Sequence, residues 1–236
     1  MRRPKLSHAI MTLCLLAVLV GLGLWQLERR EWKTALLADL AARQSAAPVP
    51  LPLDVARPKS LFYRPFRLVG RYLPDRNLFL VARTYQGQPG LNVVSPFQLD
   101  DGRVVLVNRG WAPDEAALGG ALPGEPTSVV AAAAPGGWGG MEWLRPDNNP
   151  AENRWLWLDL PAMAKAAKVG PQAVTALYFV RVPTVGQPEG YPRPVPVVPD
   201  LPNNHLQYAL TWFALALALL AIFALFHRRG PAGPRA

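Results

Sequence analysis

The sequence contains few of the side chains that build metal centres and catalytic sites. It has a single cysteine, Cys14, and only three histidines. One cysteine excludes a disulfide within the chain and leaves no cysteine pair to hold zinc or copper. The sequence also has no Gly-rich phosphate loop, no G-x-S-x-G and no H-E-x-x-H pattern. We therefore expect that the protein is not an enzyme.

Charged residues are absent from two long apolar stretches, residues 9–27 and 206–226. As helices, both are long enough to cross a hydrocarbon core of about 30 Å. The first is longer than the apolar part of a signal peptide and runs directly into a charged segment, which favours an uncleaved helix. We predict two transmembrane helices, the first of which continues as a helix through residues 28–44.

Acidic residues are absent from both tails of this basic chain. The formal net charge is +9, and residues 1–8 and 227–236 hold six of the basic residues. Basic tails beside apolar spans are typical of cytoplasmic membrane flanks, so we expect contact with membrane lipid and not with nucleic acid. Residues 28–205 are then exported. Arg29, Arg30 and Lys33 oppose this orientation, but the reverse one would place all six tail residues outside.

The region between the spans is predicted to be rich in β-strands. Short segments of branched and aromatic residues alternate with turn residues, including a hairpin turn at Asp100–Arg103. One short helix, residues 161–168, has Pro161 in its first turn. We predict a membrane protein of the α+β class, in which two transmembrane helices flank an antiparallel sheet or small barrel. The strands are expected at residues 61–72, 77–85, 91–99, 103–111, 127–134, 153–160 and 175–182.

Two further segments carry structural signals. The Pro-rich residues 183–202 favour an extended, fairly stiff strut that leads back to the membrane. Ala17 with Gly21, and Ala214 with Ala218, form pairs of small residues spaced four apart in the two spans. Because such pairs let helix backbones approach closely, we expect them at a contact between the spans.

Polar and aromatic side chains mark the outer ends of both predicted spans. His205, Tyr208 and Trp212 share one face of the second helix, and Trp25 and Arg29 share a face at the matching end of the first. His205 is the one histidine on the outer side, because the other two belong to the cytoplasmic flanks. A neutral imidazole can ligate a metal, and an arginine can bind a carboxylate. Interfacial histidine, tryptophan and snorkelling arginine give the same pattern, so both interpretations stay open.

Three motifs resemble those of a known family. They are LGLWQLERREWK at residues 22–33, LVNRGWAP at residues 106–113 and NNHLQYALTWFALA at residues 203–216. In sequence and spacing they are similar to the surfeit locus protein 1 family over nearly the whole chain. The resemblance implies an assembly factor for haem–copper oxidases, mainly cytochrome c oxidase. The short N-terminal tail resembles bacterial members, which implies the bacterial inner membrane and a periplasmic central domain.

The resemblance also implies a cargo. Some bacterial members are proposed to bind haem a through the histidine of the second span, which corresponds to His205. Tyr208, Trp212 and Trp25 would then line the haem, and Arg29 would pair with a propionate. The expected partners are the large oxidase subunit and the haem a synthesis machinery. The alternative is a membrane scaffold without cofactor that stabilises an oxidase subunit during assembly.

Residues Asn108, Arg109, Gly110 and Trp111 match the second motif of the family. Gly110 ends a predicted strand at a point where backbone freedom is needed. Arg109 and Trp111 either pin this turn or dock a partner protein, and the sequence leaves both possibilities open.

Overall fold

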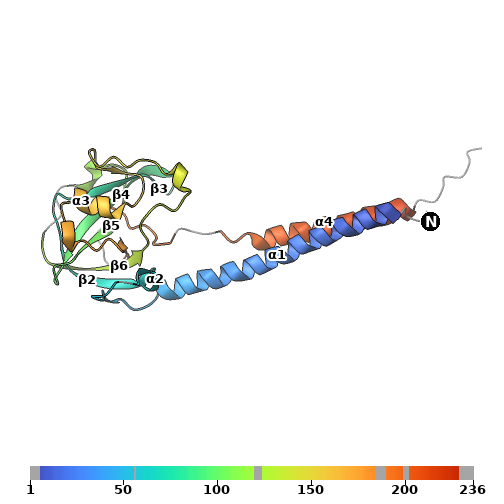
Figure 1. The fold of residues 1–236 in the computed structure, drawn as a ribbon, viewed down its shortest axis with the longest axis horizontal. Helices are drawn as coiled ribbons and strands as arrows, with labels where there is room; N and C mark the ends of the chain where they lie inside the picture. Colours follow the sequence, from blue (N-terminus) through green and yellow to red (C-terminus); the bar gives the residue numbers. More distant parts are fainter. Residues whose placement is uncertain (1–5, 56, 120–123, 184–189, 199–201, 229–236) are drawn as a thin grey trace, which may run out of the picture. The chain divides into compact units, whose positions relative to one another are not determined.

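The computed structural model describes residues 6–55, 57–119, 124–183, 190–198 and 202–228 (Figure 1). The chain divides into two compact units. Residues 1–39 and 200–236 form a helical unit, and residues 40–199 form a sheet unit. The predicted α+β class, with an apolar helix on either side of a sheet-rich domain, is confirmed.

The helical unit contains the two predicted apolar helices, α1 (Leu6–Gln44) and α4 (His205–Arg228). Both are long and apolar enough to cross a membrane. Their apolar windows are only 6% and 11% buried within the chain, whereas the core helix of a soluble protein is mostly buried. As predicted, α1 continues past its apolar part to Gln44, and it ends before Pro48 and Pro50, which cannot continue a helix.

Contact between α1 and α4 follows a heptad repeat. Their buried and half-buried side chains include a series spaced three and four residues apart, which is the spacing of a coiled-coil seam. Gly23 lies against Phe213 and Gln26 against His205, so the two helices run antiparallel. The seam comprises Leu16, Leu19, Gly23 and Gln26 in α1, and His205, Ala209, Trp212, Ala216, Leu219 and Phe223 in α4.

The small residues at this seam are not the predicted ones. Ala17, Gly21, Ala214 and Ala218 are exposed, and a Cβ added to Gly21 would meet no atom within 4 Å. The buried small residues are instead Gly23, Ala209 and Ala216. The predicted pairs had a suitable spacing, but the partner helix selects which face of a small-residue-rich span is buried.

The sheet unit is built from the predicted strands. The two-residue strand β1 and the short helix α2 (Pro58–Leu61) were not predicted. The hairpin turn predicted at Asp100–Arg103 is confirmed, because the Leu99 N–H donates to the Arg103 carbonyl at 2.8 Å. The described strands are β1 (Val49–Pro50), β2 (Pro65–Tyr72), β3 (Leu78–Tyr85), β4 (Gln88–Leu99), β5 (Val104–Ala112), β6 (Thr127–Ala134), β7 (Arg154–Trp155) and β8 (Tyr178–Arg181), with 3₁₀ turns at Ala116–Leu118, Glu142–Leu144 and Gly170–Gln172.

The strand order is β1-β2-β6-β8-β5-β4-β3-β7, and β2 also pairs with β4. Strands β2, β6, β8, β5 and β4 therefore form a closed ring of pairings. The expected antiparallel sheet is mixed, because β1 with β2, β3 with β7 and β5 with β8 are parallel. The strand expected over residues 153–160 shortens to β7, because the Asn148 side chain accepts the next two backbone N–H groups, those of Leu156 and Trp157.

The two larger of the three core clusters lie on opposite faces of β5, and the third is formed by Leu91, Val93 and Ala112. Val104 and Leu106 face the helix α3 (Leu160–Ala166), which lies beside β4 and β5 in Figure 1. Val105 and Val107 point to the other face, where they pack with Phe66, Phe97 and Phe179 inside the ring of strands. The helix predicted at residues 161–168 is present as α3, with Pro161 in its first turn. In the structure the Asp159 side chain caps it by accepting the Ala162 N–H at 3.1 Å.

Strand β5 carries one residue more than β4 at their shared edge. Val93 pairs with Gly110 and Val94 with Asn108, so Arg109 is the inserted residue of a β-bulge. Directly after the bulge, the backbones of Trp111 and Arg193 exchange two hydrogen bonds of 2.7 Å. This close approach requires Gly110, which has a φ of 133° and whose missing Cβ would lie 2.0 Å from the Arg193 carbonyl oxygen.

The same contact places part of the predicted Pro-rich strut. Among its described residues, 190–198 are bonded to β5 through Arg193, and Val195 and Val197 pack against the core cluster that contains α3 residues. This part is therefore docked on the sheet unit. Residues 184–189 and 199–201 of the segment lie outside the described residues, and the spacing role of the whole segment stays a prediction.

Replacing Gly23 with leucine should separate α1 from α4. Its Cβ would lie 2.4 Å from the Phe213 ring, and overpacking of this kind costs about 1–3 kcal/mol. A Thr34→Cys, Asn203→Cys pair in a Cys14→Ser background reports the contact, since these two side chains are hydrogen bonded at 3.2 Å. We expect the disulfide yield to fall several-fold with Gly23→Leu and to persist with the control Gly21→Leu. Equal disulfide yields in both variants would contradict the placement of Gly23 at the contact between α1 and α4.

Replacing Gly110 with alanine should destabilise the sheet unit by roughly 2–4 kcal/mol, because the change adds backbone strain and a clash with Arg193. Urea unfolding of the full-length protein in detergent, followed by tryptophan fluorescence, measures the loss. Gly139→Ala is the matched control, because a Cβ there meets no atom within 4 Å. An unfolding midpoint for Gly110→Ala equal to that of Gly139→Ala would show that the close approach is not needed.

Candidate functional site

His205 begins α4 and faces α1. Its Nδ1 lies 2.8 Å from the Gln26 Oε1 atom. An amide oxygen only accepts hydrogen bonds, so in the neutral imidazole this contact places the proton on Nδ1 and leaves the lone pair on Nε2. An imidazole whose orientation is set in this way by a second side chain is the usual arrangement of a histidine that binds a metal.

Two further side-chain bonds tie the start of α4 to α1. Lys33 donates from Nζ to the Pro202 carbonyl at 2.7 Å, and Asn203 donates from Nδ2 to the Thr34 hydroxyl at 3.2 Å. Together with the bond between His205 and Gln26, they span about two turns of α1. The imidazole is therefore held at a fixed position along the helix pair.

The other predicted haem-lining residues are spread over different faces. Trp212 is half-buried in the seam with His205, whereas the Tyr208 side chain, one turn from His205, is 56% exposed. Trp25 is 52% exposed, and the guanidinium of Arg29 lies 4.2 Å from the centre of the Trp32 ring. The structure thus brings Trp212 to the side of His205, and it leaves Trp25 and Arg29 without a recorded contact to the imidazole.

Gln26 is the site residue that sequence reasoning did not select. Its signal is a polar side chain at a seam position, where Leu16, Leu19 and Gly23 precede it at heptad spacing. A polar residue at such a position needs a partner from the facing helix. The seam can be recognised only once the facing helix is known. Sequence reasoning therefore placed the haem-lining residues of α1 on the face with Trp25 instead.

The motif at residues 108–111 is mostly internal. Asn108 is 3% exposed, and its Oδ1 accepts the Gly110 N–H at 2.9 Å. Trp111 is 1% exposed and stacks on Tyr85 with ring centroids 5.4 Å apart. These contacts pin the bulge. The buried rings and amide leave Arg109, which is half-buried, as the member of the motif that can meet a ligand or partner.

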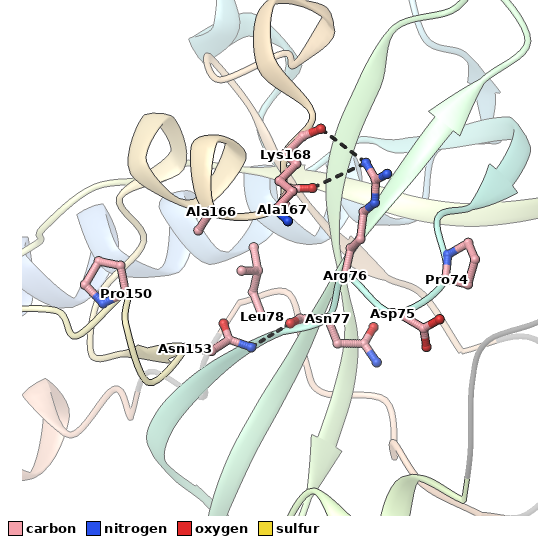
Figure 2. Close-up of a pocket in the computed structure, with 10 residues that line it drawn as sticks. All are labelled: Pro74, Asp75, Arg76, Asn77, Leu78, Pro150, Asn153, Ala166, Ala167 and Lys168. Atoms are coloured by element: carbon pink, nitrogen blue, oxygen red, sulfur yellow. Dashed lines mark hydrogen bonds between the residues drawn. The ribbon is translucent and has the colours of Figure 1, made fainter.

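The sheet unit also contains two cavities that lie apart from the predicted cofactor residues. Figure 2 shows the smaller one, of about 490 Å³, where Arg76 donates to the Ala167 and Lys168 carbonyls and Asn153 to that of Asn77. The Arg76 guanidinium and the Asn153 amide thus already have partners within the protein. The second, of about 580 Å³, is mainly apolar and includes Arg83, which donates to three carbonyls. Neither cavity is lined by a predicted cofactor residue, and no cluster of three metal-ligating side chains occurs in the described part of the chain.

The chain is similar in sequence to proteins of a known family. The SURF1 family matches residues 13–217. The chain is 34% identical to Surfeit locus protein 1 of Mus musculus over 236 residues, which covers 91% of this chain and 74% of the mouse protein. The human protein of the same name is 34% identical over 241 residues, covering 90% and 75%. The SURF1-like protein of Monosiga brevicollis is 30% identical over 234 residues, covering 90% and 85%.

None of these three relatives is bacterial, so the bacterial origin expected from the short N-terminal tail is not borne out. The family assignment does not depend on it. The matched region contains most of α1, the first half of α4 and the whole sheet unit, with His205 and the motif at residues 108–111. The chain therefore belongs to the SURF1 family, whose members are known as assembly factors of cytochrome c oxidase.

Proposed function

We propose that this protein assists assembly of cytochrome c oxidase in a membrane by holding haem a and presenting it to the large catalytic subunit, with His205 as the iron ligand. The observation that carries the proposal is the bond from His205 Nδ1 to Gln26 Oε1, which leaves Nε2 as the donor atom. Family membership supplies the link to oxidase assembly. The haem synthesis machinery and the large subunit are the partners that supply and take this cargo.

The residues around His205 suit such a cargo in their chemistry. Haem a brings an apolar macrocycle, acidic propionates and an iron that accepts nitrogen ligands. Trp212 offers an apolar surface on the same seam, and exposed Tyr208 offers a second one a single turn away. Arg29 lies at the same end of α1, where its charge can attract a propionate after leaving the Trp32 ring.

A carrier must also release its cargo. One oriented imidazole binds less tightly than a site closed by two protein ligands, which suits a transient holder. Gln26 would then act as a positioning residue, because it sets the tautomer and ring direction of His205 and does not itself touch the cargo.

Changing His205 to alanine should remove haem from the purified protein. We expect haem a, supplied by co-expressed synthesis enzymes, to appear in the absorption spectrum of the wild type in mild detergent and to be lost from His205→Ala. His227→Ala is the control, because that imidazole is bonded to the Phe223 carbonyl in the last turn of α4. Gln26→Leu should lower haem affinity by about 10–100-fold, as loss of an orienting partner does.

Two outcomes would contradict the proposal in different ways. Full haem occupancy in His205→Ala would remove this residue as the ligand. Haem-free wild-type protein, in cells whose oxidase assembly still depends on it, would favour the scaffold without cofactor.

We further propose that both tails lie in the cytoplasm and that the sheet unit lies on the opposite side of the membrane. The basic tails support this orientation. Arg29, Arg30 and Lys33 oppose it by their charge, although Arg29 and Lys33 each have a local role, on the Trp32 ring and at the Pro202 carbonyl.

Reporter fusions test this orientation in a bacterial host. An alkaline phosphatase fused after Arg57 should be active, because it folds only outside the cytoplasm, and the same enzyme fused after Ala236 should be inactive. A fluorescent protein that requires the cytoplasm should give the reverse pattern. A cytoplasmic signal from the Arg57 fusion would overturn the orientation.

A further inference from the structure

Two arginines lie side by side on neighbouring strands of the ring. The parallel register of β5 and β8 pairs Val107 with Phe179 and Asn108 with Val180. The next residues along the two strands are Arg109 and Arg181, and neighbouring strands are about 4.8 Å apart. Both side chains are half-buried. Two positive charges are therefore held close together at one end of the ring of strands.

Within the described part of the chain, neither arginine forms an ion pair with an acidic side chain. Asp101, Glu142 and Glu115 pair with other arginines, Arg103, Arg145 and Arg154. Arg181 donates from Nη2 to the Pro192 carbonyl at 2.9 Å, while its Nε is buried without an acceptor. Burial lowers the pKa of both guanidinium groups, and the charge of Arg181 lowers that of Arg109 further, yet arginine keeps its proton in proteins.

The third member of this cluster is Tyr72, at the end of β2. The residue is 8% exposed, and its hydroxyl is buried without a hydrogen-bond partner. Its ring packs edge-on against Phe97 at 4.9 Å, and the Arg109 guanidinium lies 5.4 Å from the ring centre. Burial raises the pKa of the Tyr72 phenol, although both arginines oppose the shift, so the hydroxyl is a neutral donor.

All three side chains carry hydrogen-bond donors, and none of them supplies a negative charge. Adjacent like charges in a partly buried site repel each other strongly unless a counter-charge is present. We propose that Arg109, Arg181 and Tyr72 bind an oxyanion, the phosphate or carboxylate group of a soluble molecule or of a lipid headgroup. Two guanidinium groups and a phenol are a donor set that recognises such a group.

The site also gives Arg109 a role that the rest of its motif does not have. Asn108, Gly110 and Trp111 hold the bulge in place, whereas the bulge turns Arg109 toward Tyr72. Bulges commonly redirect a side chain toward a functional position. In this arrangement the motif builds the site, and Arg109 is the member that contacts the ligand.

The test is calorimetric titration of the full-length protein in a non-ionic detergent with inorganic phosphate and, separately, with succinate. We expect wild-type protein to bind at least one of them, and Arg109→Gln and Arg181→Gln each to bind about ten-fold or more weakly, as loss of a charged hydrogen bond implies. Tyr72→Phe keeps the ring against Phe97 and should weaken binding several-fold while the fold persists.

Arg71→Gln is the matched control. Arg71 precedes Tyr72 on β2 but is exposed and bonded to the Gln98 side chain, so its loss should leave binding unchanged. Near-ultraviolet circular dichroism confirms that each variant is folded. The proposal would be overturned if the wild type bound neither anion, or if Arg71→Gln lost as much binding as the arginine variants of the site. It would also be overturned if Tyr72→Phe and one of the two site arginine variants were both folded and both bound the anion as the wild type does.

Nanodiscs distinguish the two sources of the oxyanion. If phosphatidylglycerol nanodiscs abolish the wild-type titration seen in phosphatidylcholine nanodiscs, the ligand is a lipid headgroup. If the titration is the same in both, the ligand is a soluble oxyanion. No haem is present in either experiment, so the result does not depend on the role of His205.

Discussion

The paired backbone hydrogen bonds between Trp111 and Arg193 are the constraint on which the sheet unit depends. They form only because Gly110 has no side chain, and they fasten a segment from the end of the sheet unit onto its central strand β5. Trp111 is buried beneath that segment, between Tyr85 and Tyr191. The neighbouring carbonyl of Pro192 then accepts a bond from Arg181. One glycine thus shapes the bulge, a buried aromatic cluster and the end of the ring.

Local signals in the sequence were sufficient for the elements but not for their pairing. The strand Thr127–Ala134 and the helix α3 lie at or near their predicted positions, because turn residues, branched side chains and Pro161 in the first helical turn are signals carried by a few neighbouring residues. The parallel pair of β5 with β8 and the closure of β2 onto β4 join residues far apart in the chain. No local pattern encodes these registers.

The same limit applies to the candidate sites. His205 could be selected because it is a rare residue type at the end of an apolar span, whereas its partner Gln26 is 179 residues away. Tyr72, Arg109 and Arg181 come from three strands, and each alone has the sequence context of an ordinary strand residue. Their proximity, without an acidic partner among the described residues, can be seen only when the strands are assembled.

The three side-chain bonds at the start of α4 fix its position along the axis of α1. If α4 slid along α1 by one turn, about 5.4 Å, the bonds of Lys33, Asn203 and His205 would break together, and Phe213 would lose its place over Gly23. A piston-like movement is therefore costly. The depth at which the imidazole would meet a membrane-borne ligand is set by the register of the two helices.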